Sequence, residues 1–162
     1  MSRLAVISGG GTGIGAAIAR ALMADGFDVA VIGRRPEPLE SVKGAQAIQA
    51  DLRDPAALAG VAEALGDREV DALVNNAGGY IGRSTDDIGA VARQWQETFD
   101  TNVMTAVLLT EALLPRLRRP GGRILAFSSI AAQRGGPVPT RPPRRRCTAG
   151  YWTWPRSWDP RV

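Results

Sequence analysis

The sequence predicts an α/β fold built on a doubly wound parallel sheet with helices on both faces. Short apolar runs alternate with helix-length segments up to residue 128, which is the pattern of a parallel sheet. A glycine cluster, residues 8–15, lies where the first strand meets the first helix, so that the backbone there can approach a ligand closely. Right-handed crossovers between such strands place ligands at the carboxyl ends of the strands.

The first two strands and the first helix have clear boundaries. Residues 4–8 are an apolar run of strand length, and the Ala- and Leu-rich residues 13–25 favour a helix that Gly26 ends. Residues 27–33 are a second apolar run and predict the second strand. The N–H groups at the start of the first helix would face negative charge, which favours a pyrophosphate site over a glycine turn without a ligand.

The middle of the chain predicts a short strand between two helices. A proline near its start favours a short helix over residues 36–42. Residues 45–50 predict a weak third strand. Residues 55–65 predict a helix that has Asp54 as its N-cap and a proline at its first position.

The last predicted elements complete a sheet of about five strands. Residues 70–75 predict the fourth strand, and residues 87–95 a helix. Residues 99–117 predict a long apolar helix, which ends before the fifth strand at residues 123–128. We therefore expect a doubly wound sheet of the Rossmann type with about five strands.

The composition is typical of one globular domain. Of the 162 residues, 44% are hydrophobic, and no run approaches the ~20 apolar residues of a membrane span. The N-terminus opens into a strand, so we expect no signal peptide and no membrane partner. The single cysteine, Cys147, excludes an internal disulfide, and the absence of histidine excludes a histidine base or histidine metal ligand. We expect a cytoplasmic protein with no metal site.

Positive charge is concentrated near the C-terminus. Residues 138–162 hold six Arg and one Asp, whereas the whole chain carries +4, so residues 1–137 carry about −1. The arginines of residues 141–146 and the tryptophans that follow could stack and bind single-stranded nucleic acid. Charge runs are more often solvated tails, so we expect no nucleic-acid partner.

Four motifs together resemble the classical short-chain dehydrogenase/reductases over residues 3–137. Residues 8–15 match the family's Thr-Gly-x-x-x-Gly-x-Gly, with Ser8 in place of Thr. Residues 75–78 match its Asn-Asn-Ala-Gly, and Asn102 falls where the family has an Asn in its long helix. Residues 122–130 match the strand that ends at the catalytic Ser. The resemblance implies hydride transfer between a nicotinamide cofactor and a small-molecule carbonyl or alcohol.

The resemblance also implies roles for single residues. The residues that would bind the dinucleotide are Gly9, Gly11, Thr12, Gly13, Ile14 and Gly15 at the turn, Asp51 and Leu52 beside the adenine, and Asn76, Ala77 and Gly78 along the ribose. Asn102 would hold a water in the proton relay, and Ser129 would bind the substrate oxygen. Ordinary structural explanations exist for the polar residues, which could cap a turn (Asp51), form a turn (Asn76), satisfy a helix kink (Asn102) or end a strand (Ser129).

The choice of cofactor follows from the end of the second strand. An acidic residue there would accept hydrogen bonds from the ribose 2′-OH and favour NAD. This chain has Arg34 and Arg35 instead, and guanidinium groups suit a 2′-phosphate by charge and by geometry. We expect NADP(H) as the cofactor, with NAD less favoured and Arg34 as the main contact. The alternative is that both are surface arginines without a ligand.

After residue 137 the sequence departs from the family. A Tyr-x-x-x-Lys should follow the catalytic Ser on the next helix, but residues 138–146 contain three prolines, which no helix accommodates. Lys43 is the only lysine, so the motif does not occur anywhere in the 162 residues. In the family this Tyr donates or accepts the proton, so we expect negligible turnover. A remnant that binds nucleotide without turnover is the alternative function.

We therefore divide the chain into a partial NADP(H)-binding domain, residues 1–137, and a largely disordered tail, residues 138–162. A one-base frameshift near codon 138 would explain the tail, because the shifted frame can encode a Tyr and, four codons later, a Lys. The alternative is a genuine proline-rich basic linker. The truncation would leave the fifth strand as an exposed apolar edge. It would also remove the usual oligomer surface of the family, so a homo-oligomer is doubtful.

Overall fold

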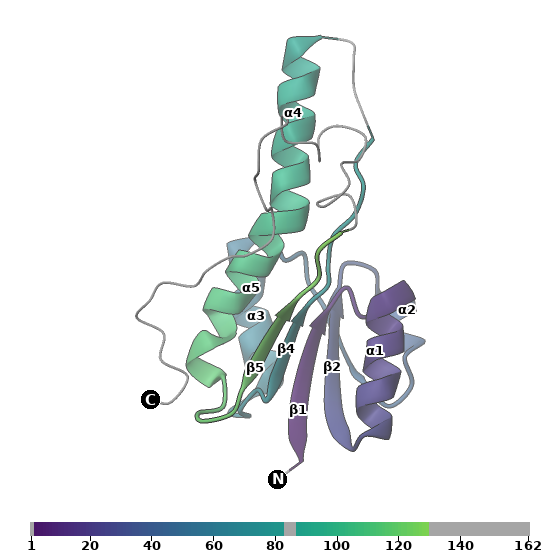
Figure 1. Ribbon diagram of the computed structural model, residues 1–162, viewed down its shortest axis with the longest axis vertical. Coiled ribbons are helices and arrows are strands. Elements are labelled where there is room, and N and C mark those ends of the chain that lie inside the picture. Colours follow the sequence, from purple (N-terminus) through teal and green to yellow (C-terminus); the bar gives the residue numbers. More distant parts are fainter. Residues whose placement is uncertain (1, 83–86, 130–162) are drawn as a thin grey trace.

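The computed structural model describes residues 2–82 and 87–129, which form a five-stranded parallel sheet (Figure 1). The strands are β1 (Arg3–Ser8), β2 (Phe27–Gly33), β3 (Gln46–Gln49), β4 (Ala72–Asn75) and β5 (Arg123–Ala126). Their order is β3-β2-β1-β4-β5, so the direction of winding reverses between β1 and β4. The predicted Rossmann-type fold class is confirmed.

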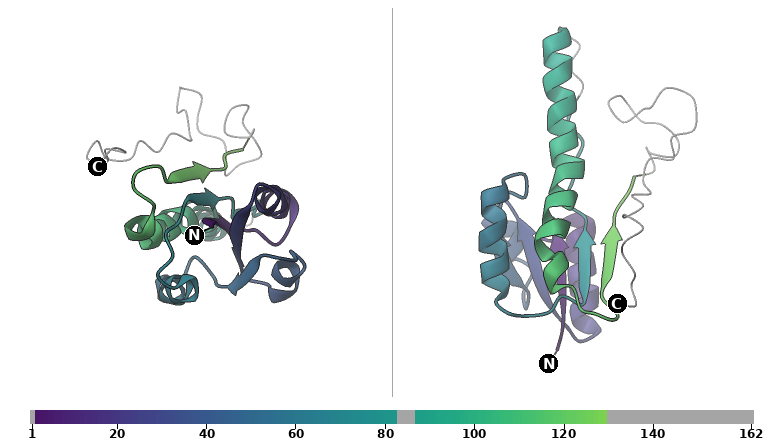
Figure 2. Two further views of the ribbon diagram at one scale, coloured as in Figure 1. Left: turned by 90° about the horizontal axis from the view of Figure 1, so that it is seen from below. Right: turned by 90° about the vertical axis from the view of Figure 1, so that its left-hand side faces the viewer.

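Helices cover both faces of this sheet (Figure 2). Helices α1 (Gly13–Ala24) and α2 (Pro36–Glu40) lie on one face, and α3 (Pro55–Leu65) and α5 (Thr105–Leu113) lie on the other. Alternate side chains of β1 point to opposite faces, so that Val6 packs with the α3 and α5 residues and Ile7 with the α1 and α2 residues. Near-continuous apolar strands such as β1 are expected where both faces of a parallel sheet are covered.

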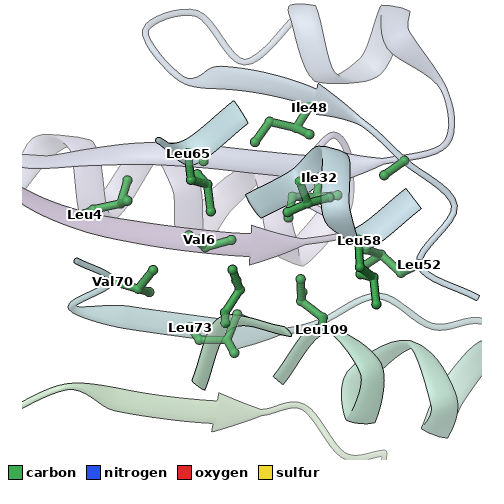
Figure 3. Packing of buried hydrophobic residues seen from close by; sticks show 14 of the residues in the cluster. Leu4, Val6, Ile32, Ile48, Leu52, Leu58, Leu65, Val70, Leu73 and Leu109 are labelled. Carbon is green, nitrogen blue, oxygen red and sulfur yellow. The ribbon is translucent and has the colours of Figure 1, made fainter. Parts of the chain in front are cut away.

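The larger apolar cluster holds the sheet against α3 and α5 (Figure 3). Ile32 and Leu109 are fully buried in it, and Leu58 of α3 is 7% exposed. Burial of such a side chain contributes roughly 1.5–3 kcal/mol relative to its exposure. This packing fixes the ends of β1, β2 and β4 relative to one another, which is what a site built across several strand ends requires.

Aspartates begin two of the helices. As predicted, the side chain of Asp54 caps α3 by accepting a hydrogen bond from the Ala56 N–H at 2.9 Å. Asp87 caps α4 (Ile88–Phe99) in the same way, with 2.7 Å between Oδ1 and the Ala90 nitrogen. Gly26, with φ of 80°, follows the C-terminus of α1 in the left-handed conformation that glycine favours.

One continuous run of helical backbone replaces two of the predicted helices. Helix α4 passes into a π-helical turn, η1 (Asp100–Met104), then into α5 and a short 3₁₀ turn, η2 (Leu114–Arg116). Phe99 and Asp100 both keep right-handed helical dihedrals, so the predicted break between residues 95 and 99 is wrong. Residues 96–98 are polar and separate two apolar stretches of the sequence, but the helical backbone of α4, which projects beyond the sheet, continues through them (Figure 1).

Strand β5 is the least covered part of the sheet. It pairs with β4 through Leu73 and Ile124, and with no other strand among the described residues. Leu125 is 52% exposed and Phe127 is 43% exposed, so the predicted exposed apolar edge is present in this part of the chain. The tail and the domain boundary at residue 137 lie outside the described residues. None of the helices in the described ranges is long and apolar enough to cross a membrane.

Candidate functional site

A cavity of about 200 Å³ lies at the carboxyl ends of the strands. Its walls are made largely by residues that follow β1, β2, β3 and β4, as the winding of the sheet predicts. The lining residues are Gly9, Gly11, Thr12, Ile32, Gly33, Arg34, Arg35, Pro38, Leu39, Ala50, Asp51, Leu52, Arg53, Ala77, Gly78, Thr101 and Thr105. Nine of the thirteen residues that were predicted to bind the cofactor therefore line this cavity.

Gly9 and Gly15 of the glycine turn have room for backbone only. Gly9 has φ of 64°, and a Cβ there would lie 3.0 Å from the Ala77 Cα. A Cβ on Gly15 would collide with the Gly9 carbonyl oxygen and lie 2.6 Å from Nδ2 of Asn76. Real Cβ contacts are not found at such separations, so α1 can approach β1 and β4 this closely only because the residue is glycine.

The start of α1 faces the cavity with unsatisfied N–H groups. Thr12 is its N-cap, but the threonine side chain makes no capping hydrogen bond. The first N–H groups of a helix have no acceptor within the helix. Gly13 and Ile14 supply the first of these groups, and Ile14 is 60% exposed. The arrangement suits an anionic ligand, because the helix dipole adds to the unsatisfied donors.

Ser8 joins the ends of β1 and β4 beneath the cavity. Its buried hydroxyl oxygen accepts hydrogen bonds from the backbone nitrogens of Asn76 and Ala77, both at 3.0 Å. The Asn76 amide donates in turn to the carbonyl oxygens of Ser8 at 3.1 Å and Gly9 at 3.2 Å. Asn76 therefore supports the glycine turn from behind instead of lining the cavity.

Three arginines line the cavity in two different states. Arg53 forms an ion pair with Asp51, with 2.6 Å between Nη2 and Oδ2. Hydrogen bonds from Arg53 lower the pKa of the Asp51 carboxyl to about 2, so this carboxylate is ionised at neutral pH. Arg34 and Arg35 are exposed and form no ion pair with any residue that the structure describes. Two guanidinium groups without an ion-pair partner in the described part of the chain therefore stand at the end of β2.

Asn102 lies in the π-helical turn and holds the segment after β4. Its Oδ1 accepts a hydrogen bond from the Gly79 nitrogen at 2.8 Å, and its Nδ2 donates to the Gly79 oxygen at 3.0 Å. The same Nδ2 donates to the Thr98 carbonyl oxygen at 2.9 Å. A π-helical turn leaves backbone groups out of the regular ladder, and such turns are frequent at functional sites. Asn102 is near the cavity residue Gly78 but does not itself line the cavity.

Comparison with known proteins decides the family. A family model described as short chain dehydrogenase matches residues 3–140, which is most of the chain. The chain belongs to the short chain dehydrogenase family. It is 35% identical over 139 residues to a serine 3-dehydrogenase from Agrobacterium fabrum, a match that covers 82% of this chain and 55% of that protein.

Solved structures of short chain dehydrogenases share the fold. A short-chain dehydrogenase from Streptomyces avermitilis superposes with a TM-score of 0.72 at 32% identity, covering 82% of this chain and 51% of that one. A blue fluorescent protein from a metagenomic library, solved in complex with NADPH, has a TM-score of 0.69 at 32% identity and covers 83% of this chain and 58% of its own. This chain therefore spans about half the length of the relatives that it matches.

The predicted catalytic residue Ser129 stands apart from the cavity of this short chain dehydrogenase. It follows β5, is exposed, and is not among the lining residues. The backbone just before it is tied to β4, because the Phe127 nitrogen donates to the Asn75 carbonyl oxygen at 2.9 Å. Its role and that of Asn102 remain predictions.

Two features of the site were missed from the sequence. From the sequence, Ser8 was noted only as a replacement of the family's Thr. The hydrogen bonds that its hydroxyl oxygen accepts from two backbone nitrogens depend on the pairing of β1 with β4. Arg53 carried no motif, although its position two residues after Asp51 was the available signal. Within residues 2–82 and 87–129, no group of three Cys, His, Asp or Glu side chains could hold a metal ion.

Proposed function

We propose that this chain binds NADP(H) in the cavity at the strand ends. The pyrophosphate would lie against Gly11 to Gly13 and the start of α1, where unsatisfied N–H groups and the helix dipole favour negative charge. The 2′-phosphate would be bound by Arg34, and the adenine would lie between Asp51 and Leu52. The relative crystallised with NADPH supports this choice of cofactor.

The shape of the glycine turn fits a dinucleotide. Gly11 and Pro38 both line the cavity, and a Cβ on Gly11 would lie 3.0 Å from the backbone of Pro38, so a side chain there would be crowded against α2. The observation that carries the choice of NADP(H) over NAD(H) is that Arg34 and Arg35 line the cavity and form no ion pair within residues 2–82 and 87–129. An acidic side chain, which would favour the free 2′-OH, is absent from these two positions.

The family reaction would be hydride transfer between this cofactor and a small carbonyl or alcohol compound. When bound, the nicotinamide would supply or accept the hydride. Ser129 would donate a hydrogen bond to the substrate oxygen, and Asn102 would order the groups that move the proton. The 162 residues contain no Tyr-x-x-x-Lys, so the proton donor of the family is missing and turnover should be very low.

The cofactor choice is tested by titrating the full 162-residue chain with NADPH and with NADH while following cofactor fluorescence. We expect NADPH to bind at least about tenfold more tightly, because guanidinium contacts to a phosphate are strong charge-assisted hydrogen bonds. Arg34→Gln should remove most of that preference. Arg68→Gln is the matched control, because Arg68 pairs with Asp28 outside the cavity. Equal affinities for the two cofactors in the unsubstituted chain would contradict the proposal.

The claim of low turnover is tested separately with the same protein. NADPH oxidation is followed at 340 nm over a panel of ketones and aldehydes. We expect no rate above the background without protein, although NADPH binds. This result would favour the second candidate, a nucleotide-binding protein without turnover. Measurable NADPH consumption with any compound would overturn the claim of impaired activity.

A further inference from the structure

Arg53 occupies both carboxylate oxygens of Asp51 at the cavity wall. Its Nε lies 3.0 Å from Oδ1 and 3.2 Å from Oδ2, and its Nη2 lies 2.6 Å from Oδ2. The Arg53 backbone nitrogen also donates to Oδ1 at 3.1 Å. Four hydrogen bonds from one residue fix the carboxylate in one orientation, since a planar guanidinium matches a carboxylate in bidentate fashion.

Arg34 and Asp51 are brought together by the pairing of β2 with β3. Gly33 is paired with Gln49, and the Ala50 nitrogen donates to the Gly33 carbonyl oxygen at 2.9 Å. The Gln49 side chain donates a hydrogen bond to the Arg34 carbonyl oxygen at 3.0 Å. This bond ties the backbone just after β2 to the end of β3. Both Arg34 and Asp51 line the same cavity, and the positive charge of Arg34 acts on the Asp51 carboxyl.

A free carboxylate at this place would compete with a phosphate for Arg34. It would attract the guanidinium as an ion-pair partner, and it would repel the 2′-phosphate directly. Arg34 nevertheless forms no ion pair among the described residues, whereas Asp51 is held by Arg53. The negative charge of Asp51 is thus compensated by Arg53.

We propose that Arg53 is a specificity-determining positioning residue, which holds Asp51 away from Arg34 and so leaves the Arg34 guanidinium available for a 2′-phosphate. The proposal rests on the proposed function, since it concerns the preference of the same site for a phosphorylated ribose. The proposed role of Arg53 differs from that of a phosphate ligand, since the side-chain donors that the structure pairs, Nε and Nη2, bind Asp51. Its effect is exerted through the charge of Asp51.

The test uses adenosine 2′,5′-bisphosphate and 5′-AMP, which differ only in the 2′-phosphate. Calorimetric titrations of the full chain at one low salt concentration give the affinity ratio of the two ligands. We expect Arg53→Gln to lower this ratio about tenfold, because an unpaired negative charge then faces the 2′-phosphate. The double variant Arg53→Gln/Asp51→Asn should restore the affinity ratio to within about threefold of the unsubstituted value. In both proteins the net charge of residues 51 and 53 is zero.

Each outcome separates the possibilities. An unchanged ratio in Arg53→Gln would overturn the proposal, and so would a loss that Asp51→Asn fails to restore, which would make Arg53 a direct phosphate ligand. An unsubstituted chain that binds neither nucleotide would overturn the proposed function together with this inference. Arg68→Gln is the matched control and should leave the ratio unchanged, because its ion pair with Asp28 lies outside the cavity.

Folding of the variants is checked by their circular dichroism and by urea denaturation. Arg53→Lys provides a second variant in case Arg53→Gln does not fold. Lysine keeps the positive charge beside Asp51 but loses the bidentate geometry. We expect Arg53→Lys to keep the ligand ratio within about threefold of the unsubstituted chain. A tenfold loss in a folded Arg53→Lys protein would show that charge compensation is not the mechanism.

Discussion

Gly15 is the residue at which the backbone geometry of the site is most constrained. A Cβ at this position would collide with the Gly9 carbonyl oxygen and lie 2.6 Å from Nδ2 of Asn76. We expect Gly15→Ala to lower stability by about 1–3 kcal/mol, as overpacking of a tight contact does. We also expect it to weaken NADPH binding at least about tenfold, because the turn must move to admit the methyl group. Urea denaturation and a fluorescence titration measure the two effects.

Gly60 provides the matched control for this substitution. It lies exposed in α3, and a Cβ there would meet nothing within 4 Å. Gly60→Ala should raise stability by about 0.5–1 kcal/mol, because alanine favours the helix interior more than glycine does. NADPH affinity should not change. If both alanine variants behaved alike, close packing at the turn would not be the cause of the Gly15 effect.

Asp51 should make stability depend on pH in a defined direction. Its folded pKa of about 2 is below its ordinary value of 3.8, so the folded chain favours the ionised carboxyl. That contribution is present above pH 3.8 and is lost as the pH falls toward 2. At pH 7 Asp51→Asn should cost less than about 1 kcal/mol, because the ion pair is partly exposed to solvent. Urea denaturation at pH 7, 4 and 3 measures the free energy of unfolding of both proteins. The difference between the unsubstituted chain and Asp51→Asn should shrink as the pH falls, and a constant difference would contradict this cause.

The sequence predicted the glycine turn, Arg34 and Asp51 as cavity residues, because each is a local signal at the end of an apolar strand. It did not predict the ion pair of Arg53 with Asp51, because Arg53 belongs to none of the motifs in the sequence. The support that Ser8 gives to Asn76 was equally inaccessible, since it joins residues 68 positions apart. Side-chain contacts across strands depend on register, which the sequence pattern alone does not fix.

At the scale of whole elements, strand and helix types were predicted well and one boundary was not. All five strands lie within or beside their predicted ranges, because buried parallel strands are short apolar runs. The prediction of two separate helices that meet before Phe99 was wrong, since the helical backbone is continuous. The error arose because residues 96–98 are all polar and interrupt the apolar pattern. Trp95 and Phe99 are nonetheless four residues apart, which is a helical spacing that bridges these polar residues.

The π-helical turn should act as an anchor for the segment after β4. The Asn102 side chain bonds to both the nitrogen and the oxygen of Gly79, at 2.8 and 3.0 Å. Asn102→Ala removes both bonds, but the side chain is exposed, so global stability should fall by less than about 1 kcal/mol. Amide exchange of residues 78–82 should accelerate several-fold, because this segment would lose its tie to the helix. Hydrogen exchange with mass spectrometry measures it.

Asn102→Asp gives a graded comparison. Aspartate keeps an oxygen to accept from the Gly79 nitrogen but loses the donor to the Gly79 and Thr98 oxygens. Its amide exchange over residues 78–82 should therefore lie between that of the unsubstituted chain and that of Asn102→Ala. Unchanged exchange in both variants would show that the segment is held by other contacts.

At the scale of the whole molecule, the two faces of the sheet are covered unequally at β5. Register places Leu125 beside Val74, on the face that α1 covers over β1 and β2. Helix α1 does not reach β5, and Leu125 is consequently 52% exposed. An edge strand with exposed apolar side chains is a template for pairing with another chain. We therefore expect this protein to associate as its concentration rises.

The association is measured by light scattering after size-exclusion chromatography at several protein concentrations. Leu125→Lys should shift the protein toward monomer, because a charge on an edge strand opposes pairing with a second strand. Ile88→Lys is the matched control, since Ile88 is 85% exposed at the start of α4, far along the chain from β5. If Ile88→Lys alone reduced association, the projecting helix would be the contact surface. A chain that stayed monomeric at every concentration would contradict the prediction that the exposed apolar edge at β5 drives association.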